Sequence, residues 1–213
     1  MNRHERRRQK KNNKLQQTVN PDLVEGIKQH ANKNFKKAEA LYNKVLLSEP
    51  VNYEALRHLG ILKQDLKEYE KAYNYFMKAI QINPNGFQAL SNIATIHMQN
   101  KNYELAYKCL KKSFEINSMY VPTINNLAGY YHKINDAKNA IKFSLKSIEI
   151  QPSSALARNQ YAKALVINGK MKEAINILED ICKARPEFDD FKINLATSSF
   201  VEKGLHLESR LDR

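Results

Sequence analysis

The feature that most constrains this chain is a repeat of 34 residues. The stretch EYEKAYNYFMKAIQINP at residues 68–84 restates NFKKAEALYNKVLLSEP at residues 34–50. Aligned units begin near Val19, Tyr53, Phe87, Val121, Ala155 and Asp189. A period of 20–50 residues indicates a stack of small structural units, each burying its apolar face against its neighbours. The period therefore favours an extended repeat fold over a bundle of unrelated amphipathic helices, which does not require such regularity.

Two columns of small residues recur when the units are aligned. The eighth residue of the units is Gly26, Gly60, Ala94, Ala128, Ala162 or Ala196, and the twentieth is Ala38, Ala72, Ala106, Ala140 or Ala174. Small side chains let two helices approach closely, so each column marks a helix–helix contact that every unit repeats. Prolines at 50, 84, 152 and 186 stop the second helix of their units. In the second unit we expect helices over about 53–66 and 69–82.

This pattern resembles the tetratricopeptide repeat, a helix–turn–helix unit of 34 residues. The resemblance rests on the two small columns, on Tyr42 and Phe76 four residues after their Ala, and on the closing prolines. It implies an all-α solenoid of antiparallel helix pairs, wound into a right-handed superhelix, with about five complete repeats and a partial sixth. We expect a basic tail at 1–18, the array at 19–204, and a partial cap or truncated unit at 205–213.

Composition and motifs argue against most other classes of function. Apolar residues make up 42% of the 213 residues, the formal net charge is +13, and no apolar run reaches membrane-helix length. Neither a phosphate-binding glycine loop nor a metalloprotease or nucleophile-elbow motif is present. The two cysteines, Cys109 and Cys182, form no metal-ligand or redox pair, which fits a reducing cytoplasm. We therefore expect no catalytic residue, no metal and no cofactor.

Three histidines have a carboxylate four residues away, namely His58 with Glu54, His132 with Asp136, and His206 with Glu202. Each pair belongs to a different unit, and a metal site needs at least three protein ligands. We interpret them as helix-face pairs rather than as ligand sets.

The sixth residue of each unit is the best candidate for binding, because the resemblance implies that it faces a concave groove. That column reads Val24, His58, Asn92, Asn126, Gln160 and Asn194. Amides offer both a donor and an acceptor, so a row of them can pair with the backbone of an extended peptide. The row resembles the asparagine ladder of glycosyltransferase arrays in this family, which hold extended polypeptide. The alternative is that Asn is common at this position and in this chain. Further groove candidates are Arg57, Asn125, Asn159 and Lys163.

The N-terminal tail is the second candidate surface. Its possible anion-contacting residues are Arg3, Arg6, Arg7, Arg8, Lys10 and Lys11. They could attract the phosphates of RNA or of an anionic lipid surface, whereas the alternative is a solvated basic tail.

Three functions follow as hypotheses. The first is a non-catalytic cytoplasmic scaffold that binds an extended peptide segment of a partner protein. The second is the substrate-recognition array of a larger bacterial transferase, of the glycosyltransferase or sulfotransferase type. The third is a protein that associates with RNA or an anionic surface through its tail.

Overall fold

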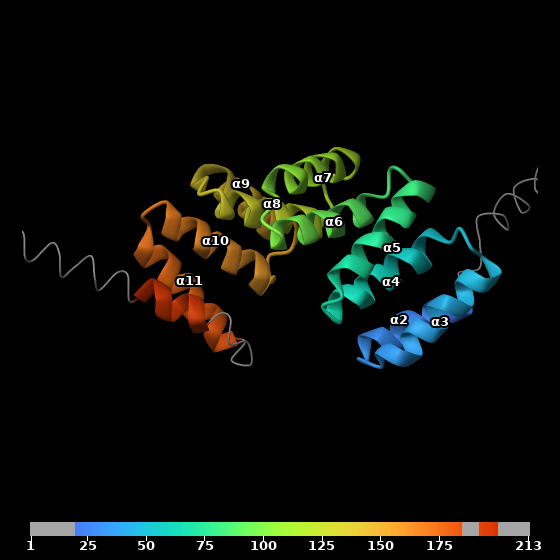
Figure 1. Ribbon diagram of the computed structural model, residues 1–213. Coiled ribbons are helices and arrows are strands. Elements are labelled where there is room, and N and C mark those ends of the chain that lie inside the picture. The colour runs from blue at the N-terminus through green and yellow to red at the C-terminus, as the bar shows by residue number, and fades with distance from the viewer. Residues whose placement is uncertain (1–19, 185–191, 200–213) are drawn as a thin grey trace, which may run out of the picture. The chain divides into compact units, whose positions relative to one another are not determined.

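The computed structural model describes residues 20–184 and 192–199, and these residues form helices joined by short turns, with no strand among them (Figure 1). The chain divides into two compact units, Met1–Ala89 and Leu90–Arg213. Every helix in the described ranges is too short or too polar to cross a lipid bilayer. The all-α class of consecutive packed helix pairs is therefore confirmed.

The first unit contains two helix pairs. α2 (Pro21–Ala31) packs on α3 (Phe35–Ser48), and α4 (Tyr53–Asp65) packs on α5 (Tyr69–Ile82). The observed bounds of α4 and α5 agree with the expected helices within one residue. α6 (Phe87–Gln99) begins here and continues into the second unit.

The second unit continues the same alternation. After α6 come α7 (Tyr103–Ile116), α8 (Val121–Lys133), α9 (Ala137–Ile150), α10 (Ala155–Ile167) and α11 (Met171–Ala184). α8 packs on α9, α10 packs on both α9 and α11, and α8 also contacts α10 directly. The first helices of successive repeats are thus neighbours, as a stacked repeat requires.

The eighth and twenty-fourth residues of a repeat are complementary in size: a smaller eighth residue goes with a larger twenty-fourth residue. A Cβ atom built on Gly60 would lie 2.4 Å from the Phe76 ring, and one built on Gly26 would lie 2.7 Å from the Tyr42 ring. Both rings are fully buried between their paired helices. In the second unit the eighth residue is Ala, and its counterpart is smaller: Ala94 lies with Leu110, and Ala162 lies with Leu178. The small eighth residue therefore makes room for a side chain of the second helix, so that the two helices of each pair can pack closely.

Each repeat turns between its two helices through a left-handed residue. Lys33, Lys67, Lys101, Asn135 and Gly169 have φ between 59° and 75°, and they are spaced by 34 residues. The next amide donates to the carbonyl five residues earlier, as from Asn34 to Gln29 at 2.9 Å and from Lys170 to Leu165 at 2.9 Å. This arrangement is a Schellman motif, which satisfies the last carbonyls of the first helix.

Neighbouring helices of the second unit meet partly through polar contacts, both between successive repeats and within one repeat. In the second unit the buried hydroxyls of Ser113 and Thr123 lie 2.6 Å apart, and Ser147 Oγ donates to Asn125 Oδ1 at 2.6 Å. Because these groups satisfy each other away from water, the α7–α8 and α8–α9 contacts have a defined register.

Candidate functional site

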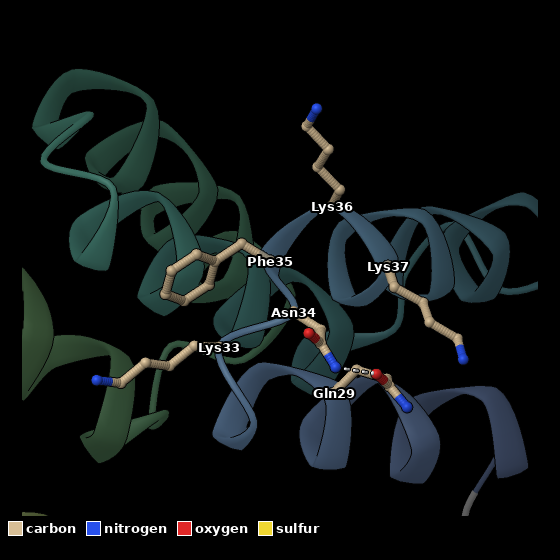
Figure 2. A pocket seen from close by; sticks show the side chains of 6 residues that line it. All are labelled: Gln29, Lys33, Asn34, Phe35, Lys36 and Lys37. Carbon is tan, nitrogen blue, oxygen red and sulfur yellow. Dashed lines mark hydrogen bonds between the residues drawn. The ribbon is translucent and has the colours of Figure 1, made fainter.

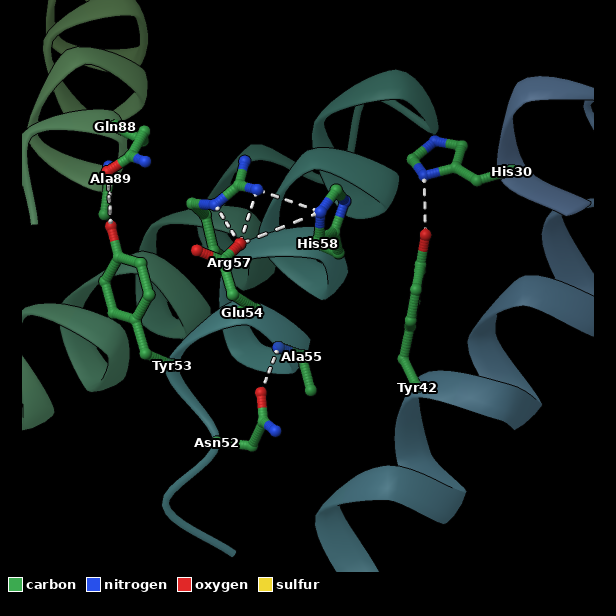
Figure 3. Close-up of polar contacts among 10 residues, drawn as sticks. All are labelled: His30, Tyr42, Asn52, Tyr53, Glu54, Ala55, Arg57, His58, Gln88 and Ala89. Carbon is green, nitrogen blue, oxygen red and sulfur yellow. Dashed lines mark hydrogen bonds and ion pairs between the residues drawn. The ribbon is translucent and has the colours of Figure 1, made fainter. Parts of the chain in front are cut away.

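The groove candidates of the first unit, Arg57 and His58, belong to a network of aromatic and ionic contacts within that unit (Figure 3). His58 lies on α4, where its ring stacks on the buried Tyr42 ring with centroids 5.6 Å apart. Arg57 donates from Nη2 to His58 Nε2 at 2.9 Å and to Glu54 Oε2 at 2.6 Å. The Tyr42 hydroxyl lies 3.4 Å from His30 Nδ1. Arg57 and His58 thus already have partners within their own unit.

Burial in this network keeps His58 neutral. Desolvation first, and then the charges of Arg57 and His30, lower the pKa of His58 to about 3. Desolvation also raises the pKa of Tyr42 to about 12, against a smaller opposing effect of Arg57. A neutral His58 accepts the Arg57 hydrogen bond at every pH at which the protein is ordinarily studied, so it offers no proton donor at Nε2 to a peptide.

A hollow of about 580 Å³ lies at the turn between α2 and α3 (Figure 2). It is lined by Gln29, Lys33, Asn34, Phe35, Lys36 and Lys37. Asn34 Nδ2 donates to Gln29 Oε1 at 2.8 Å, and Gln29 Nε2 donates to Glu25 Oε1 at 2.6 Å, so both of these lining amides have internal partners. The amines of the three lysines point in different directions, so they do not converge on a common ligand position.

The amide row of the second unit, defined here as Asn92, Asn126, Gln160 and Asn194, lies on successive first helices. Asn126 Nδ2 reaches α6, where it lies 3.1 Å from Ser91 Oγ, 3.1 Å from Thr95 Oγ1 and 3.3 Å from the Ser91 carbonyl. The NH₂ group of this residue therefore links α8 to α6. Its carbonyl oxygen takes no part in these bonds.

The last member of the row behaves in the same way. Asn194 Nδ2 donates to Asn159 Oδ1 at 3.0 Å, which joins the helical residues 192–199 to α10. Asn159 itself is buried, with 5% exposure. Asn125, another groove candidate, accepts from Ser147 in the contact between α8 and α9. These three amides thus have internal partners that the sequence did not predict.

Asn92 and Gln160 differ from the rest of the row. Both are half-buried, and within residues 20–184 and 192–199 neither side chain has a hydrogen-bond partner. A Cβ built on Gly129 of α8 would lie 3.6 Å from Gln160 Nε2, so the Gln160 side chain extends from α10 to the α8 backbone at Gly129. Each of these two amides can offer one donor group and one acceptor to a bound chain.

Two lysines lie near His132 at the C-terminal end of α8. Desolvation, followed by the positive charges of Lys163 and Lys133, lowers the pKa of His132. His132 Nδ1 is buried and has no hydrogen-bond partner within the described part of the chain. Lys163, the last groove candidate, therefore lies close enough to α8 to act on a residue of the neighbouring first helix.

Residues 20–184 and 192–199 contain no group of three His, Cys, Asp or Glu side chains that could hold a metal ion. Both cysteines are half-buried and free, and desolvation raises the pKa of the Cys109 thiol, which makes it a poor nucleophile. The tail candidates at 1–18 and the histidine pair at 202 and 206 lie outside the described residues.

Sequence reasoning missed Ser91, Thr95 and Gly129. Ser91 and Thr95 occupy the fifth and ninth places of their repeat, one turn apart, where they can reach the sixth residue of the next repeat. Gly129 lies in the middle of a helix but outside the eighth column of small residues. A glycine at such a position was the sequence signal that could have drawn attention to it.

A family model described as "Tetratricopeptide repeat" matches residues 53–85, 87–118 and 121–154. These are three consecutive 34-residue units of the sequence pattern. No curated protein sequence matches the chain.

Solved structures share the same fold at low sequence identity. A thermophilic TPR protein of Thermus thermophilus is 17% identical with a TM-score of 0.70, over 84% of this chain and 97% of that chain. YrrB, a TPR protein with an unusual peptide-binding site, is 16% identical with a TM-score of 0.58, over 76% and 84%. A chain of an APC/C hetero-tetramer is 16% identical with a TM-score of 0.79, over 85% of this chain and 36% of that chain. Residues 53–154 of this chain thus contain three tetratricopeptide repeats, and the described residues share the fold of these solved repeat proteins.

Proposed function

We propose that this protein is a non-catalytic scaffold whose second unit binds an extended segment of a partner protein along the amide row. Tetratricopeptide repeats in general imply protein partners, and the neighbour YrrB is described as having a peptide-binding site. The observation that carries the finer proposal is that Asn92 and Gln160 keep their amides without partners among the described residues.

Half-buried amides without partners are costly unless something satisfies them, and water or a ligand backbone can do so. An extended peptide presents alternating N–H and C=O groups at about 3.3 Å per residue. Packed helices lie about 8–10 Å apart, so successive amides of the row would meet about every third residue of the peptide. Contacts to backbone atoms alone would give weak selectivity for the peptide's side chains.

The four amides of the row would contribute differently to peptide binding. Asn92 and Gln160 would use both ends of their amides, whereas Asn126 and Asn194 would offer only carbonyl oxygens, because their NH₂ groups already link helices. Ala in place of Asn126 should therefore lower stability by about 1–2 kcal/mol, since Ser91 and Thr95 lose a shared partner. Ala at Asn92 should leave stability almost unchanged.

The test uses the full chain and a fluorescent, unstructured peptide that binds it, measured by anisotropy. The double variant Asn92→Ala with Gln160→Ala should weaken binding about tenfold, since two hydrogen-bonding amides of about 1 kcal/mol each are lost. A version of the peptide with N-methylated backbone amides should lose a comparable amount against the unaltered chain.

A matched control removes one Asn and one Gln from exposed positions of the same unit, with Asn176→Ala and Gln99→Ala. Circular dichroism should show equal helix content in both double variants. Equal affinity of the two double variants, or undiminished binding of the N-methylated peptide, would show that the amide row does not hold the peptide.

A further inference from the structure

We propose that the first-helix face of the second unit selects an acidic extended segment, whose backbone passes over Gly129 with its carboxylates beside Lys133 and Lys163. This inference rests on the proposed function, because it names the chemistry of the peptide that the amide row would hold. Three separate observations on the second unit support it.

The first observation is a complete lack of carboxylates on these helices. α6, α8, α10 and the helical residues 192–199 contain no Asp or Glu, and they carry Lys133, Arg158, Lys163 and Lys192. The first helices of the first unit differ, because α2 carries Asp22 and Glu25, and α4 carries Glu54 and Asp65. A surface of one sign attracts a ligand of the opposite sign and repels competitors of its own sign.

The second observation is that lysines of two neighbouring first helices act on one residue. Lys133 follows His132 at the end of α8, and after desolvation the charges of Lys163 on α10 and of Lys133 lower the pKa of His132, so the positive charge here belongs to the lysines. Gln160 lies one helical turn before Lys163 and therefore on the same face of α10. A peptide hydrogen-bonded to Gln160 would thus place its neighbouring side chains within reach of Lys163 and Lys133.

The third observation is that Gly129 has no packing reason to be glycine. A Cβ there would make only ordinary contacts, at 3.6 Å from Gln160 Nε2 and 3.8 Å from Met98 Cε. Gly26 and Gly60, in contrast, are required by aromatic rings that a Cβ would overlap. Glycine in the middle of a helix is unfavourable, and a common use of it is to let another backbone come close. Gly129 lies one turn after Asn126, so it lies in line with the amide row on the same face of α8.

An acidic peptide fits these observations better than a nucleic acid. The face offers half-buried amides suited to a peptide backbone. The aromatic side chains of its described first helices are half-buried rather than exposed, so they do not form a row of open rings on which bases could stack. Nucleic acid remains the alternative outcome of the test, because it would also respond to the lysines.

The experiment compares three fluorescent probes on the full chain: a peptide of repeated Glu-Gly-Ser triplets about twelve residues long, the same peptide with Gln for Glu, and an oligouridine of similar length. The Glu peptide should bind about tenfold more tightly than the Gln peptide at low salt, and the difference should shrink as salt is raised. Equal binding of both peptides overturns the acidic selectivity but leaves the scaffold proposal intact. Binding of neither peptide contradicts the scaffold proposal itself. Oligouridine binding more tightly than the Glu peptide overturns the inference in favour of nucleic acid.

Two sets of variants locate the site. Lys133→Gln with Lys163→Gln should weaken the Glu peptide about tenfold and flatten its salt dependence, whereas Lys112→Gln with Lys172→Gln, on the exposed faces of α7 and α11, should change it less than about twofold. Gly129→Ala should raise the melting temperature by about 2–4 °C and yet weaken the Glu peptide about fivefold or more. Equal losses from both lysine pairs, or unchanged affinity of Gly129→Ala, would place the peptide elsewhere.

Discussion

The two units are built from one repeat and differ in what they leave available. In the first unit, Gly26 and Gly60 admit buried aromatic rings, and the groove candidates Arg57 and His58 are taken up by Glu54 and by the Tyr42 ring. In the second unit, alanine and aliphatic residues fill the same contact, while Asn92 and Gln160 keep their amides without partners among the described residues.

The difference teaches that one column of an alignment can serve two purposes. At the sixth position, His58 contributes to the packing of the first unit, whereas Gln160 reaches Gly129 in the second and keeps its amide without a hydrogen-bond partner among the described residues. Glycine shows the same division, since a Cβ at Gly60 would overlap the Phe76 ring, whereas a Cβ at Gly129 would make only ordinary contacts with Gln160 and Met98. The repeat sets the positions, and the local partners decide whether a residue stabilises the fold or stays available for binding.

The largest expected effect is the loss of the glycine–aromatic match in the first unit. Gly60→Ala should destabilise the protein by about 2–3 kcal/mol, because the new Cβ would lie 2.4 Å from the Phe76 ring and force the helices apart. The second-unit control, Gly129→Ala, should instead stabilise by about 1 kcal/mol. Denaturant unfolding followed by circular dichroism measures both changes.

A double-mutant cycle shows whether the match itself is responsible. Phe76→Leu converts the pair to the Ala–Leu combination seen at Ala94 and Leu110, so adding it to Gly60→Ala should restore about 1.5 kcal/mol or more. Additive losses in the double variant would mean that Gly60 is needed for another reason, and the contrast between the units would then lose its steric basis.

The sequence predicted the scaffold well because its constraints are local and repeated. The small columns at Ala38 and Ala72 and the turn after Pro84 place α3 and α5 correctly, since steric fit between paired helices depends on residues a fixed distance apart. The candidate surface was less predictable. Whether the amide of Asn126 faces outward or reaches Ser91 depends on the distance between two helices, and that distance comes from packing rather than from any motif.

The next effect concerns pH and sharpens the contrast in burial. His58 has a folded pKa of about 3 against 6.5 when unfolded, so the unfolded state takes up a proton first as the pH falls. Stability contributed by neutral His58 is therefore present above about pH 6.5 and is lost progressively toward pH 3, by up to about 1.4 kcal/mol per pH unit. Between pH 6.5 and 5 the wild type should lose up to about 2 kcal/mol through this group.

The variant His58→Asn places at this position the residue that the second unit uses, and it should flatten the pH dependence of the melting temperature over that range. His132→Asn in the second unit should flatten it less, since the pKa of His132 is lowered in the same direction but to a smaller extent. A wild-type curve that coincides with that of His58→Asn between pH 6.5 and 5 would mean that His58 is accessible and shares the open character of the second unit.

The smallest effect tests the turns, where the left-handed residue is lysine in the first unit and changes to Asn135 and then Gly169 in the later repeats of the second, although the geometry is the same. Lys67 adopts φ of 61° in the first unit, and Gly169 adopts φ of 75° in the second. A side chain in the left-handed region costs about 1 kcal/mol, whereas glycine enters it freely. Lys67→Gly should therefore stabilise by about 0.5 kcal/mol after the loss of chain entropy, and Gly169→Ala should destabilise by about 1 kcal/mol. Because no atom lies within 4 Å of a Cβ at Gly169, a loss there can come only from the backbone, and an unchanged stability would show that the turn relaxes to another conformation.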